Sequence, residues 1–347
     1  MQMFISDRKP LVSIMIPNYN HARYLDGCIQ SALNQTYDNI EIVVLDNSSE
    51  DESVEVAQKY ISQGVKVCRN AFNILNNNYK VLANSLAKGK YMMLLCADDV
   101  IEQNFIEKAV DIMEKYPTVG YVHGERDFIT DDGAIVELDP FFNCSFVAPG
   151  RNMMPIYMLT TVAHPSQGVF RKETFIKIDG YDKEIDHMNA DKMLWFYLSY
   201  ESDYAYIREK MCRIRIGNLT ETYLTQRNFQ HPILCYLTIK EFVEFAKQKN
   251  LPEVIEREEK AIGNLVHEFL QNAAGLILQH DYATANKYIQ FSNVLYPQIV
   301  EEPDYKLLNT MVHDQRADGA KLVKFKVDYS NKARNYCPPD NYMEIGD

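Results

Sequence analysis

The chain has 347 residues, of which 46% are hydrophobic and 24% charged, so it has the composition of a globular protein with one large domain or two of ordinary size. Acidic residues outnumber basic ones by 48 to 36, and the net charge of -12 disfavours binding to nucleic acid or anionic lipid. No apolar run approaches the ~20 residues that span a bilayer, and the first ten residues do not resemble a secretory signal. The seven cysteines form no Cys-x-x-Cys pair, which favours reduced thiols. We therefore expect a cytoplasmic protein.

The first hundred residues alternate short apolar runs with amphipathic stretches. The pattern predicts strands at 11–16, 40–45, 65–67 and 91–96, and helices at 21–35, 50–63 and 77–87. Such an alternation favours a mostly parallel sheet with helices on both faces. Ligands of these sheets bind beyond the carboxyl ends of the strands, so the residues that follow each strand are the first candidates for a site.

Polar residues follow three of the predicted strands. Pro17-Asn18-Tyr19-Asn20 follows the first, Asp46-Asn47-Ser48-Ser49 the second, and Asp98-Asp99 the fourth. Two adjacent carboxylates need a positive charge nearby, and their oxygen atoms suit Mg²⁺ or Mn²⁺ bound to a nucleotide diphosphate. The alternative is helix capping, by Ser48 or Ser49 near residue 50 and by Asp98 or Asp99 near residue 103.

Four segments resemble the inverting glycosyltransferases of family 2, which have the GT-A fold. They are the first strand and its loop, the helix that ends in Gln-Thr-Tyr, the second strand and its loop, and the segment up to the Asp-Asp pair, at 12–20, 28–37, 41–51 and 87–99. The resemblance extends over about residues 10 to 220. It implies an α/β fold of GT-A type, with a mostly parallel twisted sheet flanked by helices, and a glycosyltransferase domain at 1–220.

The resemblance also implies roles for the polar residues. The residues expected to hold the base and ribose of the nucleotide, usually uridine, are Pro17, Asn18, Tyr19, Asp46, Asn47 and Ser48. Asp98 would face the ribose or the metal, and Asp99 would ligate the Mn²⁺ or Mg²⁺ that neutralises the departing diphosphate. Arg215 stands where the family often has a histidine, and it would hold diphosphate oxygens instead.

Asp191 is the candidate general base. An inverting transfer needs a carboxylate that takes the proton of the acceptor hydroxyl as this hydroxyl attacks the anomeric carbon. Residues 189–195 resemble the segment of the family that carries this base, and the alternative for Asp191 is a helix N-cap. Trp195 lies one helical turn later on the same face, so it is a weak candidate for a platform under the acceptor sugar, with a place in the core as the alternative.

The chain beyond residue 220 has a different pattern. Long amphipathic stretches predict helices at 232–249, 252–279 and 282–295. We expect a helical C-terminal region at 221–347, which is a candidate platform for an acceptor or partner and a candidate surface for self-association.

The resemblance thus implies an inverting glycosyltransferase of the hexosyltransferase class. It would move a sugar from a nucleotide donor, a UDP-sugar, to a hydroxyl of a glycan, lipid-linked or protein acceptor. The usual setting of the family is polysaccharide biosynthesis, with contact to the membrane surface where the acceptor is lipid-linked. The alternative is a nucleotide- or sugar-binding module that no longer transfers, because the Asp-x-Asp motif is only partial in Cys96-Ala97-Asp98-Asp99 and the usual histidine is replaced. No glycine-rich loop follows the first strand, which disfavours a nucleotidyltransferase and a dinucleotide-dependent dehydrogenase.

Overall fold

The centre of the fold is an eleven-stranded sheet. The computed structural model describes residues 9–75, 77–180, 189–217, 227–325 and 334–346. The strands are β1 (Val12–Asn18), β2 (Ile40–Asp46), β3 (Lys66–Arg69), β4 (Tyr91–Leu94), β5 (Val100–Ile101), β6 (Val119–Thr130), β7 (Ile135–Val136), β8 (Phe146–Ala148), β9 (Gly168–Arg171), β10 (Asp203–Ile216) and β11 (Met343–Glu344).

Helices of very different length accompany the sheet. The α-helices are α1 (Ala22–Leu33), α2 (Ser53–Gln58), α3 (Asn77–Lys80), α4 (Phe105–Lys115), α5 (Met154–Leu159), α6 (Lys172–Lys177), α7 (Ala190–Glu201), α9 (Gln230–Lys249), α10 (Pro252–Ile255), α11 (Glu258–Leu278), α12 (Tyr282–Leu295), α13 (Pro303–His313) and α14 (Gly319–Leu322). Short 3₁₀ segments are η1 (Ile61–Gln63), η3 (Gly150–Met153), η4 (Pro165–Gln167), η5 (Pro297–Glu301) and η6 (Val323–Phe325), and η2 (Val81–Leu86) is a π-helical turn.

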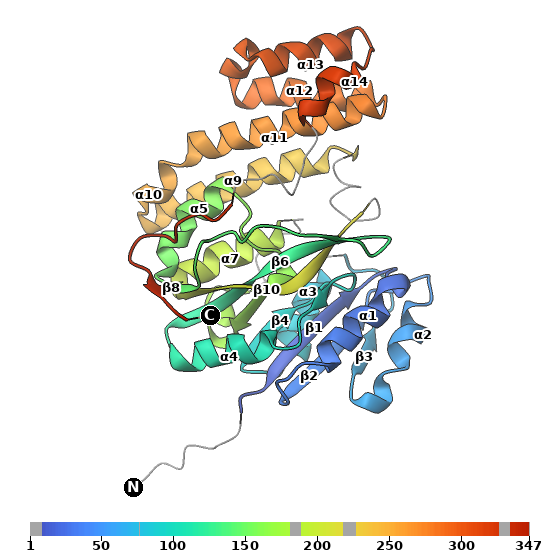
Figure 1. Ribbon diagram of the computed structural model, residues 1–347, viewed down its shortest axis with the longest axis vertical. Coiled ribbons are helices and arrows are strands. Elements are labelled where there is room, and N and C mark those ends of the chain that lie inside the picture. Colours follow the sequence, from blue (N-terminus) through green and yellow to red (C-terminus); the bar gives the residue numbers. More distant parts are fainter. Residues whose placement is uncertain (1–8, 76, 181–188, 218–226, 326–333, 347) are drawn as a thin grey trace.

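The strand order brings distant segments to one edge of the sheet. The strands lie in the order β11-β8-β10-β6-β9-β4-β1-β2-β3, with β5 beside β10 and β7 beside β6. Along this order every strand runs in one direction except β8 and β9. The predicted mostly parallel sheet is therefore confirmed. Pairing of β1 with β2 places Asn18 opposite Asp46, so the loops after β1, β2 and β4 share one edge (Figure 1).

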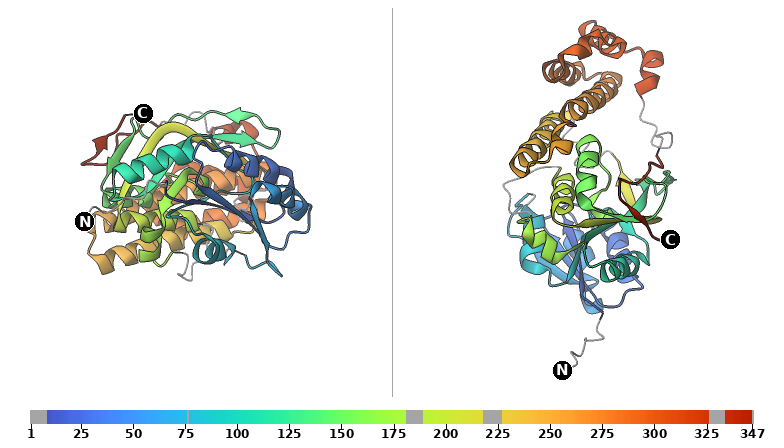
Figure 2. Two further views of the ribbon diagram at one scale, coloured as in Figure 1. Left: turned by 90° about the horizontal axis from the view of Figure 1, so that it is seen from below. Right: turned by 90° about the vertical axis from the view of Figure 1, so that its left-hand side faces the viewer.

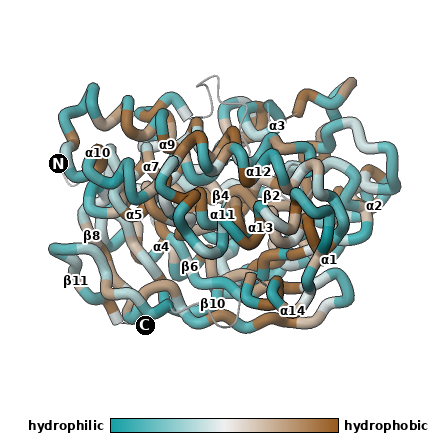
Figure 3. The backbone as a smooth tube through the Cα atoms, turned by 90° about the horizontal axis from the view of Figure 1, so that it is seen from above, coloured by the Kyte–Doolittle hydropathy of each residue, from teal (hydrophilic) through white to brown (hydrophobic). Residues whose placement is uncertain are grey.

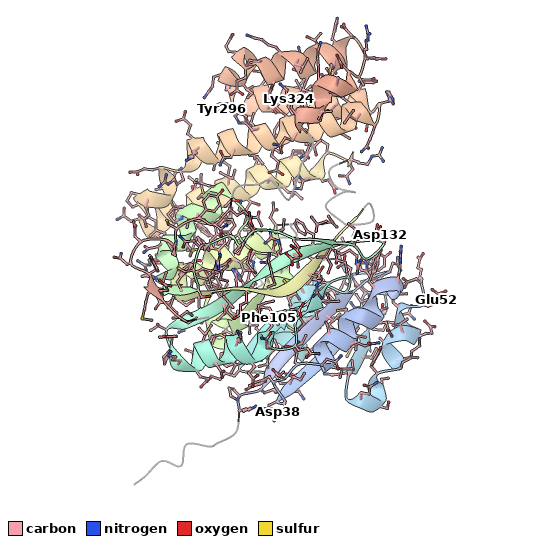
Figure 4. The ribbon with its side chains drawn as sticks, in the orientation of Figure 1. Asp38, Glu52, Phe105, Asp132, Tyr296 and Lys324 are labelled. Atoms are coloured by element: carbon pink, nitrogen blue, oxygen red, sulfur yellow. The ribbon has the colours of Figure 1, made fainter. Side chains whose placement is uncertain are left out.

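Helices cover both faces of the sheet, as the alternating pattern predicted (Figure 2). On one face α1, α2 and α4 pack on Val12 and Ile14 of β1, and Phe105 at the start of α4 lies in this core (Figure 4). On the other face η2, α5 and α7 pack on Met15 of β1 and Met92 of β4. Successive side chains of a strand point to opposite faces, which is why Ile14 and Met15 belong to different cores.

The helices α9 to α14 form a stack, here called the helical arm, that extends away from the sheet (Figure 1). The predicted C-terminal helical extension is thus confirmed, although the stretch expected as one helix at 252–279 is divided into α10 and α11. Phe242 of α9 stacks on Phe196 of α7, with ring centroids 3.8 Å apart, and joins the arm to the sheet layer. Hydrophobic and hydrophilic residues alternate along α11 and α12 in Figure 3, as expected for helices that bury one face.

The last described segment, residues 334–346, is here called the C-terminal tail, and it lies against the sheet (Figure 2). Strand β11 pairs antiparallel with β8, and the N–H of Tyr336 donates to the carbonyl of Phe141 at 2.8 Å. Arg334 lies 3.4 Å from the fully buried carboxylate of Glu125 on β6. Among the described helices, none is long and apolar enough to cross a membrane.

Candidate active site

The ends of β1 and β2 are joined by hydrogen bonds around Asp46. Nδ2 of Asn18 donates to Asp46 Oδ1 at 2.9 Å and to Ser49 Oγ at 3.1 Å. The N–H of Ser49 donates to Asp46 Oδ2 at 3.0 Å, and Arg69 Nε lies 3.4 Å from the same oxygen. Asn18 and Asp46 are almost completely buried. The fold therefore fixes the Asp46 carboxylate at the carboxyl edge of the sheet, where the sequence predicted it.

The loops after β1 and β2 hold further residues that were predicted to contact a nucleotide. Pro17 is half-buried, and the ring of Tyr19 is 41% exposed. Asn20 and Ser48 have left-handed backbone, with φ of 56° and 66°. Such values in residues other than glycine are strained and persist only where surrounding contacts impose them. One such contact joins the two loops, because the N–H of Glu50 donates to Asn20 Oδ1 at 2.8 Å.

Asn47 shapes the loop after β3. Its Nδ2 donates to Asn73 Oδ1 at 2.8 Å and to the carbonyl of Leu75 at 3.2 Å. Its Oδ1 accepts a hydrogen bond from the N–H of Ile74 at 3.0 Å. The amide of Asn47 is therefore engaged with the protein itself, and it determines where the loop lies relative to Asp46.

Helix capping does not explain these polar residues. Helix α2 begins at Ser53 after Glu52, and α4 begins at Phe105 after Asn104, in both cases without a side-chain hydrogen bond from the preceding residue. Helix α7 is preceded by Asn189. The capping alternative is therefore wrong for Ser48, Ser49, Asp98 and Asp99. The Asp191 carboxylate is not at the N-cap position either, but it accepts hydrogen bonds from N–H groups of the first turn of α7, including that of Lys192.

Asp98 and Asp99 lie in different environments after β4. Asp99 is 1% exposed, and it accepts hydrogen bonds from Ser166 Oγ at 2.6 Å and from the N–H of Arg215 at 2.8 Å. Burial and the charge of the half-buried Asp98 raise the pKa of Asp99 well above its ordinary value. Arg215 Nε donates to the carbonyl of Asp98 at 2.9 Å, and its guanidinium lies 4.0 Å from the ring centre of Tyr24. Arg215 thus ties β10 to the loop of the two carboxylates.

Two residues that the sequence did not suggest as ligands flank Asp99. Sγ of Cys96, a carboxylate oxygen of Asp99 and a ring nitrogen of His164 lie within 4.8 Å of one another. Burial and the charge of Arg126 lower the pKa of His164 to about 3, so its ring is neutral. Ser166 organises the group, because its Oγ accepts a hydrogen bond from the N–H of Cys96 at 3.0 Å and donates to Asp99. Carboxylate, thiol and neutral imidazole are all metal-binding groups, so this donor set fits a divalent cation.

Asp191 lies in the first turn of α7. Its carboxyl group is half-buried, and burial raises its pKa to about 6, against the opposing effect of the charges on Lys192 and Arg126. The charge of Asp191 contributes to the raised pKa of the Cys96 thiol, so the two groups are electrostatically coupled. A carboxyl group with a pKa near neutrality is suited to accept a proton from a substrate.

The prediction that Trp195 could lie under an acceptor sugar is wrong. Its side chain is 1% exposed, with Tyr121 stacked on it at 5.9 Å between ring centroids and His123 edge-on at 4.4 Å. A Cβ atom on Gly168 would come within 2.4 Å of the indole, so β9 passes directly over the ring. Trp195 is a core residue that holds α7, and with it Asp191, against the sheet.

Sequence reasoning also missed Arg69 and Arg126. Arg69 is the last residue of β3, contacts Asp46, and donates through Nη2 to the carbonyl of Ser49 at 2.9 Å. Its place at the carboxyl end of the third strand is the signal that could have found it. Arg126 is held by the side chain of Gln167 and by the carbonyl of Val162, and only the tertiary structure brings it near His164 and Asp191.

The family model described as Glycosyl transferase family 2 matches residues 13–178. An uncharacterized glycosyltransferase of Rickettsia prowazekii is 28% identical over 321 residues, which cover 86% of this chain and 91% of the relative. An uncharacterized glycosyltransferase of Haemophilus influenzae is 30% identical over 140 residues, and the match spans 40% of each protein.

Two solved structures have a similar fold. The crystal structure of Staphylococcus aureus TarS 1–349 in complex with UDP-GlcNAc matches with a TM-score of 0.58 and 16% identity, over 88% of this chain and 92% of that one. The mannosyltransferase PcManGT from Pyrobaculum calidifontis, in complex with GDP-Man and Mn²⁺, matches with a TM-score of 0.53 and 16% identity. This match covers 92% of this chain and 89% of PcManGT.

Proposed function

Residues 13–178 belong to glycosyl transferase family 2, and from this premise we propose that the chain is an inverting glycosyltransferase in which Asp191 is the general base. The observation that carries the proposal is the place of Asp191 in the first turn of α7, near Cys96 and Arg126, where burial raises its pKa to about 6. We assign separate roles to three carboxyl groups: Asp46, locked in hydrogen bonds, and Asp99, beside potential metal ligands, lie at the carboxyl edge of the sheet, and Asp191 in the first turn of α7 accepts a proton.

We propose a UDP-sugar as the donor. The Asp46 carboxylate and the amide of Asn18 are fixed side by side for polar contacts with the base and ribose, and the exposed ring of Tyr19 offers a surface for stacking. Pro17 and Ser48 border the same site, and Asn47 keeps the loop after β3 in place. The complex of TarS with UDP-GlcNAc supports a uridine nucleotide, whereas the complex of PcManGT with GDP-Man supports a guanosine nucleotide, and a donor panel separates the two.

We propose that Mn²⁺ or Mg²⁺ assists the reaction, with Asp99 as a ligand and Asp98 facing the ribose or the cation. The bound cation would neutralise charge on the departing diphosphate. The donor set around Asp99 and the Mn²⁺ in the PcManGT complex support this. Arg215 would add a positive charge for the diphosphate oxygens, while its Nε keeps the Asp98 loop in place.

In the transfer itself, the Asp191 carboxylate would accept the proton of the acceptor hydroxyl. The hydroxyl oxygen then forms a bond to the anomeric carbon from the face opposite the nucleotide, and the bond from this carbon to the diphosphate oxygen breaks. Arg126 would face this reaction from the side of His164, with its guanidinium held by the side chain of Gln167.

We also propose that the chain consists of a catalytic domain at 1–220 and a helical region at 221–347 that serves as platform for the acceptor or a partner, or for self-association. The free thiols of the seven cysteines support a cytoplasmic protein, which would assemble surface polysaccharide and work at the membrane when its acceptor is lipid-linked. The acceptor is a glycan, a lipid-linked sugar or a protein.

The test is release of nucleoside diphosphate from a panel of UDP- and GDP-sugars, with and without Mn²⁺. We expect one donor to be hydrolysed slowly by the native chain, and we expect Asp191→Asn to lower the rate by about 10²–10⁴-fold while nucleotide affinity stays within about twofold. Asp281→Asn is the matched control, because Asp281 lies at the start of α12 in the arm and its amide replacement still caps the helix. Normal nucleotide binding without turnover of any donor, even with candidate acceptors added, would instead support the non-catalytic binding module.

A further inference from the structure

We propose that Cys96, Asp99 and His164 together ligate the divalent cation, and that this mixed set of sulfur, oxygen and nitrogen donors favours transition metals, Mn²⁺ among them, over Mg²⁺. The proposal rests on the proposed function, because it names the ligands and the metal preference of the same site. It gives Cys96 a role in place of the missing first carboxylate of the Asp-x-Asp motif.

The geometry of the three donor atoms is close to that of a metal site. They lie within 4.8 Å of one another, and Nδ1 of His164 is 3.5 Å from Oδ2 of Asp99. Bonds of ~2.0–2.3 Å from one cation to sulfur, nitrogen and oxygen ligands place these ligands ~3–4 Å apart. Small side-chain rotations therefore suffice to bring all three atoms onto one ion.

His164 is placed to share a cation with Asp99. Its Nδ1 is buried and faces the buried Asp99 carboxylate, with 3.5 Å between Nδ1 and Oδ2. A nitrogen lone pair and a carboxylate oxygen at this separation can both reach one ion. A cation bound between Nδ1 of His164 and Asp99 would satisfy both groups.

The surrounding residues hold the proposed ligands in place. Ser166 Oγ donates to Asp99 Oδ2 and accepts from the N–H of Cys96, so one hydroxyl orients two of the three ligands. On the other side, the N–H of Arg215 donates to Asp99 Oδ1 at 2.8 Å. Hydrogen bonds that orient ligands in this way are usual around metal sites.

The charges near the site are mixed. The neighbouring carboxylate of Asp98 attracts a cation, while the guanidinium groups of Arg126 and Arg215 oppose it. Arg215 is held by hydrogen bonds to the carbonyl groups of Asp98 and Thr130, and Arg126 by Gln167 Oε1, but these neutral acceptors leave both positive charges in place. Cysteine binds as the thiolate, so its proton passes to the solvent when the cation binds.

Donor chemistry decides which cation fits. Mg²⁺ prefers a shell made of oxygen atoms, whereas thiolate and imidazole favour Zn²⁺ and other transition metals. An aspartate at position 96 would offer the cation another carboxylate oxygen. Cys96 offers a sulfur atom instead, and this exchange shifts the preference of the site away from Mg²⁺. We therefore expect Zn²⁺ to bind more tightly than Mn²⁺, and Mn²⁺ more tightly than Mg²⁺.

The test is titration of the reduced full-length chain with Co²⁺, read out by the near-ultraviolet absorption band of a cobalt-thiolate bond. We expect the native chain to develop this band, and Cys96→Ser to lose it. Because Cys337 is the exposed thiol and could bind cobalt non-specifically, Cys337→Ser is the control and is expected to retain the band. His164→Asn should keep the thiolate band but weaken Co²⁺ binding by at least about tenfold. Zn²⁺ should displace Co²⁺ at stoichiometric concentration, and Mg²⁺ should not.

Two results would overturn the proposal: no thiolate band in the native chain, or an undiminished band in a folded Cys96→Ser variant. Circular dichroism of each variant shows whether it has folded, and His164→Asn keeps the test decisive if Cys96→Ser does not fold. Nucleotide binding is measured on the same samples. Turnover of a donor without a thiolate band refutes the ligand set and leaves the proposed function intact, while a thiolate band without nucleotide binding supports the ligand set and contradicts the proposed function.

Discussion

The edge of the sheet that carries the candidate site and the helical arm above it are held together by different kinds of contact. At the edge, side chains from distant segments of the chain bond to one another, as Asn18 does to Asp46 and Ser166 to Asp99. In the arm, rings pack on rings: Phe269 of α11 is fully buried, stacked on Phe291 and edge-on to Tyr288 of α12.

The two regions therefore contribute differently: contacts at the sheet edge serve mainly binding and turnover, and contacts in the arm serve mainly stability. Polar networks at the sheet edge position charges at a modest net gain in stability, because each hydrogen bond replaces one made to water. Apolar packing in the arm removes surface from water and contributes mainly to stability. Substitutions at the edge should therefore change binding and turnover, and substitutions in the arm should change the free energy of unfolding.

The largest effect is expected for Phe269→Ala. Loss of a fully buried aromatic side chain leaves a cavity, and the free energy of unfolding should fall by about 3–5 kcal/mol, measured by urea denaturation. Nucleotide affinity at a temperature where the variant is folded should be unchanged. Phe72→Ala is the control, since this ring is 69% exposed and its removal should leave stability nearly unchanged. A loss of nucleotide binding by folded Phe269→Ala would break the separation between the two regions.

Arg334→Gln comes next, because it tests how the C-terminal tail is attached. The variant leaves the buried carboxylate of Glu125 without its ion-pair partner, although the charges of Arg126 and Lys210 also act on it, and should cost about 3 kcal/mol of unfolding free energy. Lys306→Gln removes an exposed ion pair with Glu301 in the arm and should have little effect on thermal unfolding. Equal stability of the two variants would show that the ion pair of Arg334 with Glu125 does not stabilise the fold.

The pH dependence of turnover tests the candidate active site without involving the helical arm. A base must be deprotonated to act, so kcat/KM should be constant above pH 7 and fall about tenfold per pH unit below the Asp191 pKa of about 6. The residual rate of Asp191→Asn should not show this midpoint. A profile with its midpoint near pH 4 would mean that Asp191 has the pKa of an ordinary exposed carboxyl group and that burial does not tune it.

The smallest effect is expected for Asp281→Ala. Asp281 caps α12 by accepting a hydrogen bond from the N–H of Thr284 at 3.1 Å, and its loss should cost about 1 kcal/mol in urea denaturation. Turnover should not change. Asp281→Asn should keep most of the stability, and an equal loss in both variants would point to the charge of Asp281 rather than to capping.

The sequence by itself determined the order of the elements and the position of the edge. Apolar runs such as 40–45 and 91–96 have one stable arrangement, as buried strands between helices, and the residue that follows a strand must lie at its carboxyl end. For this reason the pattern of apolar and polar residues is sufficient to place Asn18, Asp46 and Asp99 at one edge.

Only the tertiary structure decided what each polar residue contacts. Trp195 belongs to the core because β9 passes over it, His164 faces Asp99 because η4 lies beside β4, and Asp191 has a raised pKa because its surroundings bury it. The C-terminal tail returns to β8, far from it in sequence. Burial, pKa and ligand geometry depend on neighbours contributed by other parts of the chain, and local periodicity contains no information about such neighbours.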